Sequence, residues 1–130
     1  MQRQHFLLMG ALMGMVAVIL GAFGAHGLEK ILDELMLKRF HTGVEYQFYH
    51  ALALVLTASL APLSLTRYWK LACWGFFIGI LLFSGSLYVY TLTGVRSIAM
   101  ITPLGGLSFI AGWLFLILAL WQAPAQNGRN

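Results

Sequence analysis

Few residues in this sequence could do chemistry, and they fall near the ends of long apolar runs. Charged residues make up only 9% of the chain, whereas hydrophobic residues make up 60%. Glu45 and His50 lie close together in one apolar run, and Arg96 follows another. A carboxylate and a guanidinium can pair with each other or bind an ion, and an imidazole can move a proton or ligate a metal. These three side chains are therefore the first candidates for a functional site.

One pair of histidines and one histidine–glutamate pair allow two further sites, but no other residue supports either one. His26 and His50 could ligate a haem from opposite sides, and His41 and Glu45, at i and i+4 of a helix, could face one metal ion. A metal site needs at least three ligands, however, and one cysteine, Cys73, excludes a cysteine metal site or a disulfide within the chain. The chain also lacks a hydrolase nucleophile elbow, a phosphate-binding glycine loop and an HExxH motif. We predict no catalytic residue, cofactor or metal ligand.

The composition indicates what surrounds these residues. A soluble domain needs polar side chains over its exterior, and a mean hydropathy of +0.81 leaves too few of them. In a bilayer the exterior must itself be apolar. The net charge of +4 could indicate a nucleic-acid partner, but the basic residues are scattered singly and form no patch. The sequence therefore predicts an integral membrane protein surrounded by lipid, with no nucleic-acid partner.

Four apolar runs could each cross the membrane, so we predict an all-α membrane protein with one domain over residues 1–130. The hydrocarbon core is about 30 Å thick, which roughly 20 helical residues span. The predicted spans cover residues 6–25, 43–65, 71–92 and 97–121. In the last run, Thr102 and Pro103 resemble an N-cap and a proline at the first helical position, so a break is expected there.

Small residues in the third span predict a close helix contact. Gly75 and Gly79 form a GxxxG pair, and Gly85 lies between two serines. Glycines let two helix backbones approach and gain dispersion contacts that lipid cannot supply. The neighbouring helix could belong to this chain, to a second copy in a homo-oligomer, or to another membrane protein.

Residues 28–40 repeat apolar side chains at helical spacing, with charged side chains on the opposite face. Glu34 and Lys38 form an i, i+4 pair in the favourable order. We therefore predict a short amphipathic helix lying in the membrane interface, between the first two spans. The second span would then begin at Thr42, whose Thr-x-x-Glu spacing to Glu45 is that of a capping box.

Four spans place both termini on one side of the membrane. Lysine and arginine divide equally between the two sides, so their number does not decide the orientation. Arg3 precedes the first span, and a short loop carries Arg67 and Lys70, which is the setting where the positive-inside rule works best. These residues favour cytoplasmic termini.

With this threading, polar residues gather in the half of the bundle opposite the termini. Ionisable groups at membrane depth cost several kcal/mol unless they are paired, so such residues usually face the bundle interior. A Glu45–Arg96 salt bridge is expected on these grounds, with capping as the alternative role for Glu45 and structural hydrogen bonds as the alternative for the histidines. The candidate polar cluster is His26, Glu45, Gln47, His50, Tyr88, Arg96 and Thr102.

Four sequence words also carry a resemblance to a known family. They are GAFGAHGL at 21–28, TGVEYQFYHALAL at 42–54, LFSGSLYVYTLTG at 82–94 and ITPLGGLSFIAGW at 101–113. In this order they resemble the YgdD/YwdK-type family of small inner-membrane proteins, domain of unknown function 423, whose animal relatives are called transmembrane protein 256. The resemblance implies a bacterial cytoplasmic-membrane protein with four helices and cytoplasmic termini, and it supplies no substrate or catalytic residues to carry over.

Two classes of function fit these observations. A non-enzymatic structural, assembly or accessory membrane subunit fits because large soluble regions and reaction chemistry are both missing. A binder or transporter of a small molecule, lipid or quinone could instead use the polar cluster. Glu45 is the only carboxylate in any predicted span and lies at its edge, which disfavours proton transport through the middle of the membrane.

Overall fold

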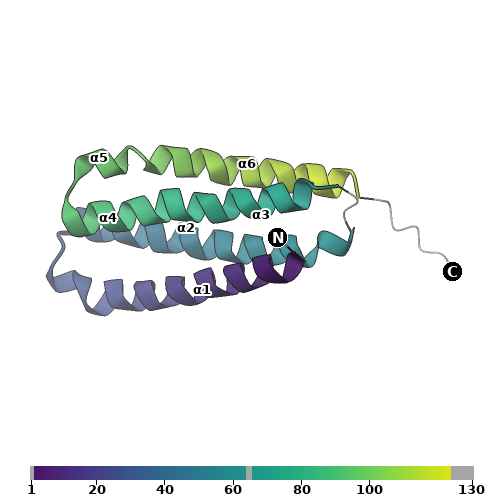
Figure 1. The fold of residues 1–130 in the computed structure, drawn as a ribbon. Coiled ribbons are helices and arrows are strands. Elements are labelled where there is room, and N and C mark those ends of the chain that lie inside the picture. The colour runs from purple at the N-terminus through teal and green to yellow at the C-terminus, as the bar shows by residue number, and fades with distance from the viewer. Residues whose placement is uncertain (1, 64–65, 124–130) are drawn as a thin grey trace.

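Long helices run side by side in the computed structural model, which describes residues 2–63 and 66–123 (Figure 1). They are α1 (Arg3–His26), α2 (Glu34–Ser59), α3 (Tyr68–Gly79), α4 (Gly85–Thr93) and α6 (Thr102–Trp121), with a short α5 (Arg96–Ala99). The π-helical turn Ile80–Ser84 joins α3 to α4, so these two run on as one helical segment. Two 3₁₀ turns, Leu28–Lys30 and Ala61–Leu63, lie in the connections. The described residues contain helices and turns and no strand, as predicted.

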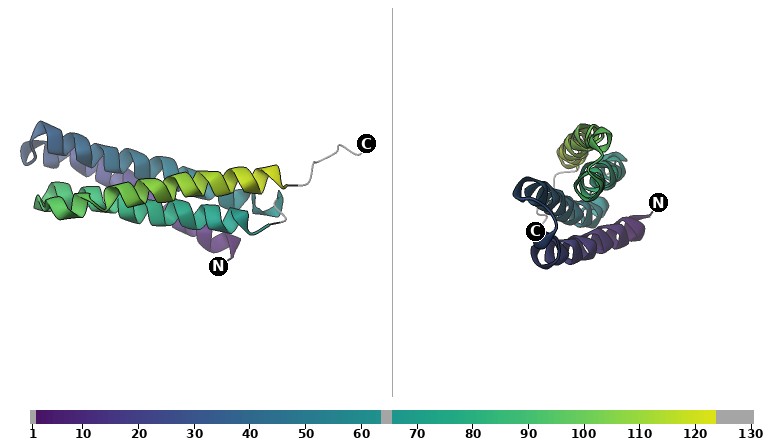
Figure 2. Two further views of the ribbon diagram at one scale, coloured as in Figure 1. Left: turned by 90° about the horizontal axis from the view of Figure 1, so that it is seen from above. Right: turned by 90° about the vertical axis from the view of Figure 1, so that its left-hand side faces the viewer.

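Helix α2 connects the bundle, because it contacts both α1 and the segment formed by α3 and α4. Helix α1 packs along α2, and α6 packs along α3 and the π-helical turn, while α2 also contacts α3 and α4 (Figure 2). The start of α1 and the end of α6 lie at the same end of the bundle (Figure 1). At that end the Arg3 Nε donates to the Ala58 carbonyl at 3.0 Å, which satisfies one of the last carbonyls of α2. We call the opposite end, with α5 and the α1–α2 connection, the α5 end.

Three helical segments are long and apolar enough to cross a membrane: Arg3–His26, Tyr68–Thr93 and Arg96–Trp121. Large apolar side chains cover their outer surfaces, among them Val18, Leu107 and Ile110. Helix α2 is just as long, at 26 residues, but it is more polar. Its polar side chains Gln47, His50 and Thr57 are buried in the bundle, whereas Leu52 and Leu56 are exposed on its surface.

The predicted amphipathic helix over residues 28–40 is not one element. Residues 28–30 form a 3₁₀ turn, and α2 begins at Glu34 because the Asp33 side chain caps it, accepting from the Met36 amide at 2.8 Å. The apolar face is also split, since Leu28 is buried but Ile31 is 75% exposed. A separate interfacial helix is therefore not found in this structure.

The capping box predicted at Thr42 is also wrong, because α2 already begins after Asp33. No proline lies between Asp33 and Ser59, and α2 runs without a break from Glu34 through Ser59. The Thr42 hydroxyl donates to the Lys38 carbonyl at 3.1 Å, a bond that threonine can make inside a helix. Glu45 therefore lies in the body of α2, more than two turns past its start.

Small residues bring α3 and α6 together, as predicted for Gly75 and Gly79. A Cβ atom on Gly75 would lie 2.8 Å from the Gly112 Cα, and one on Gly79 would run into the Phe109 ring. The prediction was wrong for Gly85, where a Cβ would meet nothing nearer than the Ile80 carbonyl oxygen at 4.0 Å. The GxxxG face of α3 is covered by α6 of the same chain.

The helical chain is interrupted shortly before Pro103. Helix α4 ends at Thr93 and is capped by Gly94, which has a φ of 74° and donates its amide to the Tyr90 carbonyl at 2.7 Å. Helix α5 follows and stops at Ala99, and α6 restarts with Pro103 in its first turn. The N-cap is Ile101 rather than Thr102, and it makes no side-chain cap bond.

Candidate functional site

Gln47 joins three helices through its side-chain amide. It is 2% exposed, and its Nε2 donates to the Met13 carbonyl of α1 at 2.8 Å. Its Oε1 accepts from the Tyr88 hydroxyl of α4 at 2.6 Å. A helical carbonyl keeps a second lone pair, so Met13 can accept this bond without losing its own helix bond. Gln47 and Tyr88 are two predicted site residues that the structure does bring together.

A second bond between α2 and the α3–α4 segment lies beside this pair. Ser84, the last residue of the π-helical turn, donates to the Gly43 carbonyl at 2.6 Å. Gly43 has no side chain in the way, and a Cβ there would lie 2.9 Å from the Tyr88 ring. The absence of a side chain at Gly43 thus lets Tyr88 lie close against α2 and reach Gln47.

His50 has a partner for each ring nitrogen. Its Nδ1 lies 2.7 Å from the Tyr46 carbonyl, and its Nε2 lies 3.1 Å from the Trp113 Nε1. Because a carbonyl only accepts and an indole N–H only donates, the bonds require a neutral imidazole with its proton on Nδ1. The ring also stacks on Phe109 of α6. His50 therefore holds α2 to α6.

Thr102 belongs to a third contact, at the start of α6. The hydroxyls of Ser86 and Thr102 lie 2.5 Å apart, and Ser86 also lies 2.9 Å from the Phe83 carbonyl. This bond ties α4 to α6 at the α5 end. Further along, Ser108 donates to the Gly75 carbonyl at 2.8 Å, where the two backbones come close.

The remaining predicted site residues lie apart from these contacts. Glu45 is exposed and lines a groove of about 430 Å³ between α1 and α2, together with Ala17, Gly21 and Phe48. Arg96 is exposed and lines a different groove, next to α4 and α6. His26 is exposed at the end of α1. The predicted cluster is thus several separate contacts and three exposed side chains.

The expected Glu45–Arg96 salt bridge is not formed, since the two side chains line different grooves. The reason is the rotation of α2 about its axis. Residues two apart on a helix point about 200° away from each other, so Glu45 faces outward when Gln47 faces inward. Only one of the two can share an interior site with Tyr88.

Sequence reasoning missed Trp113 and Arg39. Trp113 lies near the middle of the fourth predicted span, where an indole N–H needs an acceptor, and that need is the signal that could have pointed to a polar partner. Arg39 was assigned to the surface helix. It is half-buried, and its Nη1 donates to the Tyr90 hydroxyl at 2.8 Å.

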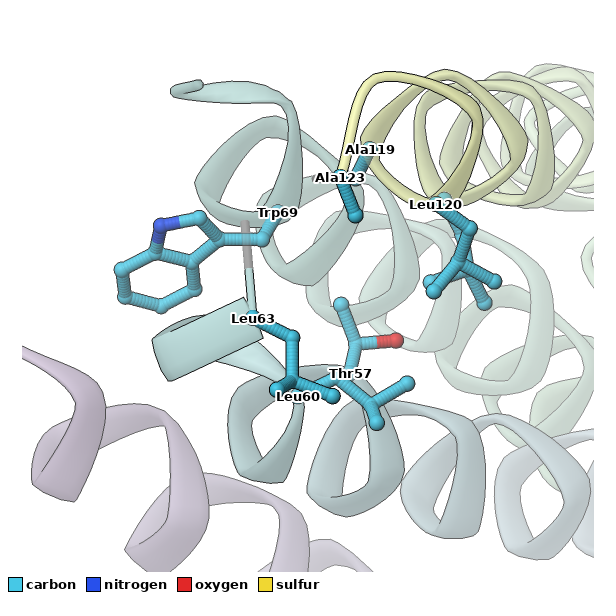
Figure 3. Close-up of a pocket in the computed structure, with 8 residues that line it drawn as sticks. Thr57, Leu60, Leu63, Trp69, Ala119, Leu120 and Ala123 are labelled. Atoms are coloured by element: carbon cyan, nitrogen blue, oxygen red, sulfur yellow. The ribbon is translucent and has the colours of Figure 1, made fainter. Parts of the chain in front are cut away.

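A small cavity lies at the end of the bundle away from α5, between the ends of α2 and α6 (Figure 3). Its volume is about 10 Å³, close to the space that a single water molecule needs. Thr57 lines it, but the Thr57 hydroxyl already donates to the Ala53 carbonyl at 2.7 Å. This cavity is too small for a small-molecule ligand. The described residues also contain no group of three or more His, Cys, Asp or Glu side chains that could hold a metal ion.

A bundle of long helices with apolar outer surfaces and hydrogen-bonded polar side chains inside defines a small helical membrane protein. Comparison with known proteins gives the family. Residues 20–106 match the family described as "Protein of unknown function (DUF423)", and the chain belongs to it. The resemblance to YgdD/YwdK-type proteins is therefore confirmed.

The relatives are membrane proteins by name and are similar over nearly their whole length. The UPF0382 membrane protein YwdK of Bacillus subtilis is 47% identical over 88% of this chain and 94% of its own. The UPF0382 membrane protein of Haemophilus influenzae is 43% identical over 95% and 98%. The UPF0382 inner membrane protein YgdD of Escherichia coli is 38% identical over 91% and 90%. No solved structure matches the chain.

Proposed function

We propose that this chain is a four-span protein of the bacterial cytoplasmic membrane that acts as a non-enzymatic structural, assembly or accessory subunit. The observation that carries the proposal is that the buried polar side chains bond to partners within the chain. Every buried side-chain nitrogen or oxygen in the described residues has a hydrogen-bond partner. Saturated polar networks make a core rigid and specific, which suits a structural role.

The position of α2 supports a fourth span. It lies along α1 and along the segment Tyr68–Thr93, which contains α3 and α4, and both of these can cross a membrane by length and composition. Polar residues are tolerated in a membrane helix when they face the bundle and are bonded there, as Gln47 and His50 are. The lower hydropathy of α2 therefore reflects its inward face, and Leu52 and Leu56 give it an apolar outer surface.

Charges at the two ends support cytoplasmic termini. Arg3, Arg67 and Lys70 lie at the end where α1 begins, with no acidic residue among the described residues there. All four acidic residues of the chain, Glu29, Asp33, Glu34 and Glu45, lie toward the α5 end. The short basic loop between α2 and α3 again favours the cytoplasm for the first of these ends.

The alternative function, a small-molecule or quinone binder that uses the polar cluster, has less support. A ligand at Gln47 or His50 would have to break a bond between helices and leave a buried group unsatisfied, at about 1–3 kcal/mol each. Neither Gln47 nor His50 lines the small cavity or the two grooves described above.

Native mass spectrometry of the chain, extracted with its surrounding lipid into polymer discs, tests the proposal. A structural or accessory subunit should be retained in a fixed ratio with a second membrane protein and carry no small molecule other than lipid. A stoichiometric small molecule that disappears in a His50→Phe variant would show instead that the polar cluster is a binding site. The Trp121→Phe variant, altered on the exposed surface, is the matched control.

A further inference from the structure

Two arginines share one groove at the α5 end of the bundle. The groove has a volume of about 590 Å³. Its polar side carries Arg39 of α2, Tyr90 of α4, Arg96 of α5 and Thr102 of α6, and its apolar side carries Phe83 and Leu87. It therefore joins α2 to the three consecutive helices α4, α5 and α6.

Neither arginine has a carboxylate partner. Glu29, Asp33, Glu34 and Glu45 are all described, and none of them lines the groove or forms an ion pair with Arg39 or Arg96. Two guanidinium groups beside one groove repel each other unless an anion lies between them. The groove thus carries positive charge that no Asp or Glu side chain neutralises within residues 2–63 and 66–123.

Arg39 is held in place before any ligand arrives. Its Nη1 donates to the Tyr90 hydroxyl at 2.8 Å, and its guanidinium lies 5.5 Å from the centre of the Tyr90 ring. A guanidinium has five N–H donors, so most of them remain for a ligand. Its planar fork matches the oxygens of a phosphate and can bind two of them at once.

The groove is polar at the end of the bundle and apolar toward the middle. Leu87 and Phe83 lie one and two helical turns deeper than Tyr90, a descent of about 10 Å at 1.5 Å per residue. The segments Tyr68–Thr93 and Arg96–Trp121, which carry every lining residue except Arg39, can cross a membrane by length and composition. The arginines therefore fall at headgroup level and the apolar wall at acyl-chain level. A free inorganic anion has no apolar part that could pack against Phe83 and Leu87.

From this arrangement we infer that the groove is a binding site for an anionic phospholipid. Arg39 and Arg96 bind the phosphate, and an acyl chain lies along Leu87 and Phe83. Basic pockets between membrane helices bind lipid headgroups by this combination of charge and apolar surface. The site is independent of the structural role proposed above, since it uses neither Gln47 nor His50.

The test measures lipid retention by the full chain in nanodiscs of phosphatidylcholine doped with phosphatidylglycerol, read by native mass spectrometry. The unaltered chain should retain phosphatidylglycerol selectively. Arg39→Gln and Arg96→Gln should each lower the apparent affinity about tenfold, which corresponds to ~1.4 kcal/mol. Lys38→Gln removes a charge one residue from Arg39 but outside the groove, and it should leave retention unchanged.

Three results would overturn the inference. Equal losses in Lys38→Gln and Arg39→Gln would indicate diffuse attraction to an anionic surface. Displacement of phosphatidylglycerol by millimolar inorganic phosphate would indicate a site for a free anion. The Ala99→Trp variant keeps both arginines and fills the groove, so it tests the inference even if an arginine variant fails to fold. Unchanged retention of phosphatidylglycerol in this variant would show that the groove is not the binding site.

Discussion

The imidazole of His50 lies face to face with the ring of Phe109, with centroids 3.6 Å apart and planes 10° from parallel. Trp113, one turn further along α6, donates to the His50 Nε2 from the edge. One side chain of α2 is thus held by two of α6, by stacking and by a hydrogen bond. This contact lies in the middle of α6. If the bond between Trp113 and His50 were broken there, the surrounding lipid would offer no water to replace it.

Replacing Trp113 with phenylalanine should lower the free energy of unfolding by about 1–3 kcal/mol, because the buried His50 Nε2 would lose its donor. The loss should be smaller when His50→Phe is already present. A double-mutant cycle, measured by denaturation in detergent micelles, should therefore give a coupling of at least ~0.5 kcal/mol. Trp121 is 85% exposed, and Trp121→Phe should change stability by less than ~0.5 kcal/mol. Equal losses at both tryptophans would contradict a specific bond to His50.

Gly75→Ala and Gly85→Ala make a matched pair in one helical segment. At Gly75 the added methyl would lie 2.8 Å from the Gly112 Cα, a backbone atom that cannot rotate away, so we expect a loss of roughly 1–3 kcal/mol. At Gly85 nothing lies nearer than 4.0 Å, so alanine should be neutral or slightly stabilising. Thermal midpoints and folding yields in detergent measure both. A larger loss at Gly85 would mean that the α3–α6 contact is wrongly placed.

Gln47 and Tyr88 should be energetically coupled, whereas Glu45 and Arg96 should not. Gln47→Leu and Tyr88→Phe break the same 2.6 Å bond, so together they should cost at least ~0.5 kcal/mol less than the sum of the two single losses. Glu45→Gln and Arg96→Gln alter side chains in different grooves, and their effects should add within ~0.5 kcal/mol. Coupling between Glu45 and Arg96 of the same size would restore the salt bridge expected from the sequence alone.

Topology reporters test the span count and the orientation together. A reporter fused to the C-terminus and one inserted after Arg67 should both be active in the cytoplasm, and one inserted near Glu34 should be active outside. This outcome requires α2 to cross the membrane. If the Glu34 and Arg67 reporters lie on the same side, α2 does not span. If all three positions score opposite to expectation, the bundle is inverted.

The local sequence pattern by itself predicted the helical character of the chain and one close helix contact, at Gly75 and Gly79. Apolar runs of membrane length predicted an all-helical chain, and Pro103 predicted the break before α6, because run length and a missing backbone donor act within one segment. The small residues at Gly75 and Gly79 predicted a close helix contact, since a backbone approach requires the absence of a side chain. The family resemblance also came from the sequence words alone.

Only the tertiary structure decided which polar residues meet. Asp33 starts α2 nine residues earlier than the capping box predicted, and packing against α1 and α4 then sets the rotation that turns Gln47 inward and Glu45 outward. Periodicity shows that two residues lie on opposite faces, but it does not show which face a neighbouring helix will cover. Trp113 is 63 residues from His50 and Tyr90 is 51 residues from Arg39 along the chain, so these two contacts depend on how separate helices pack.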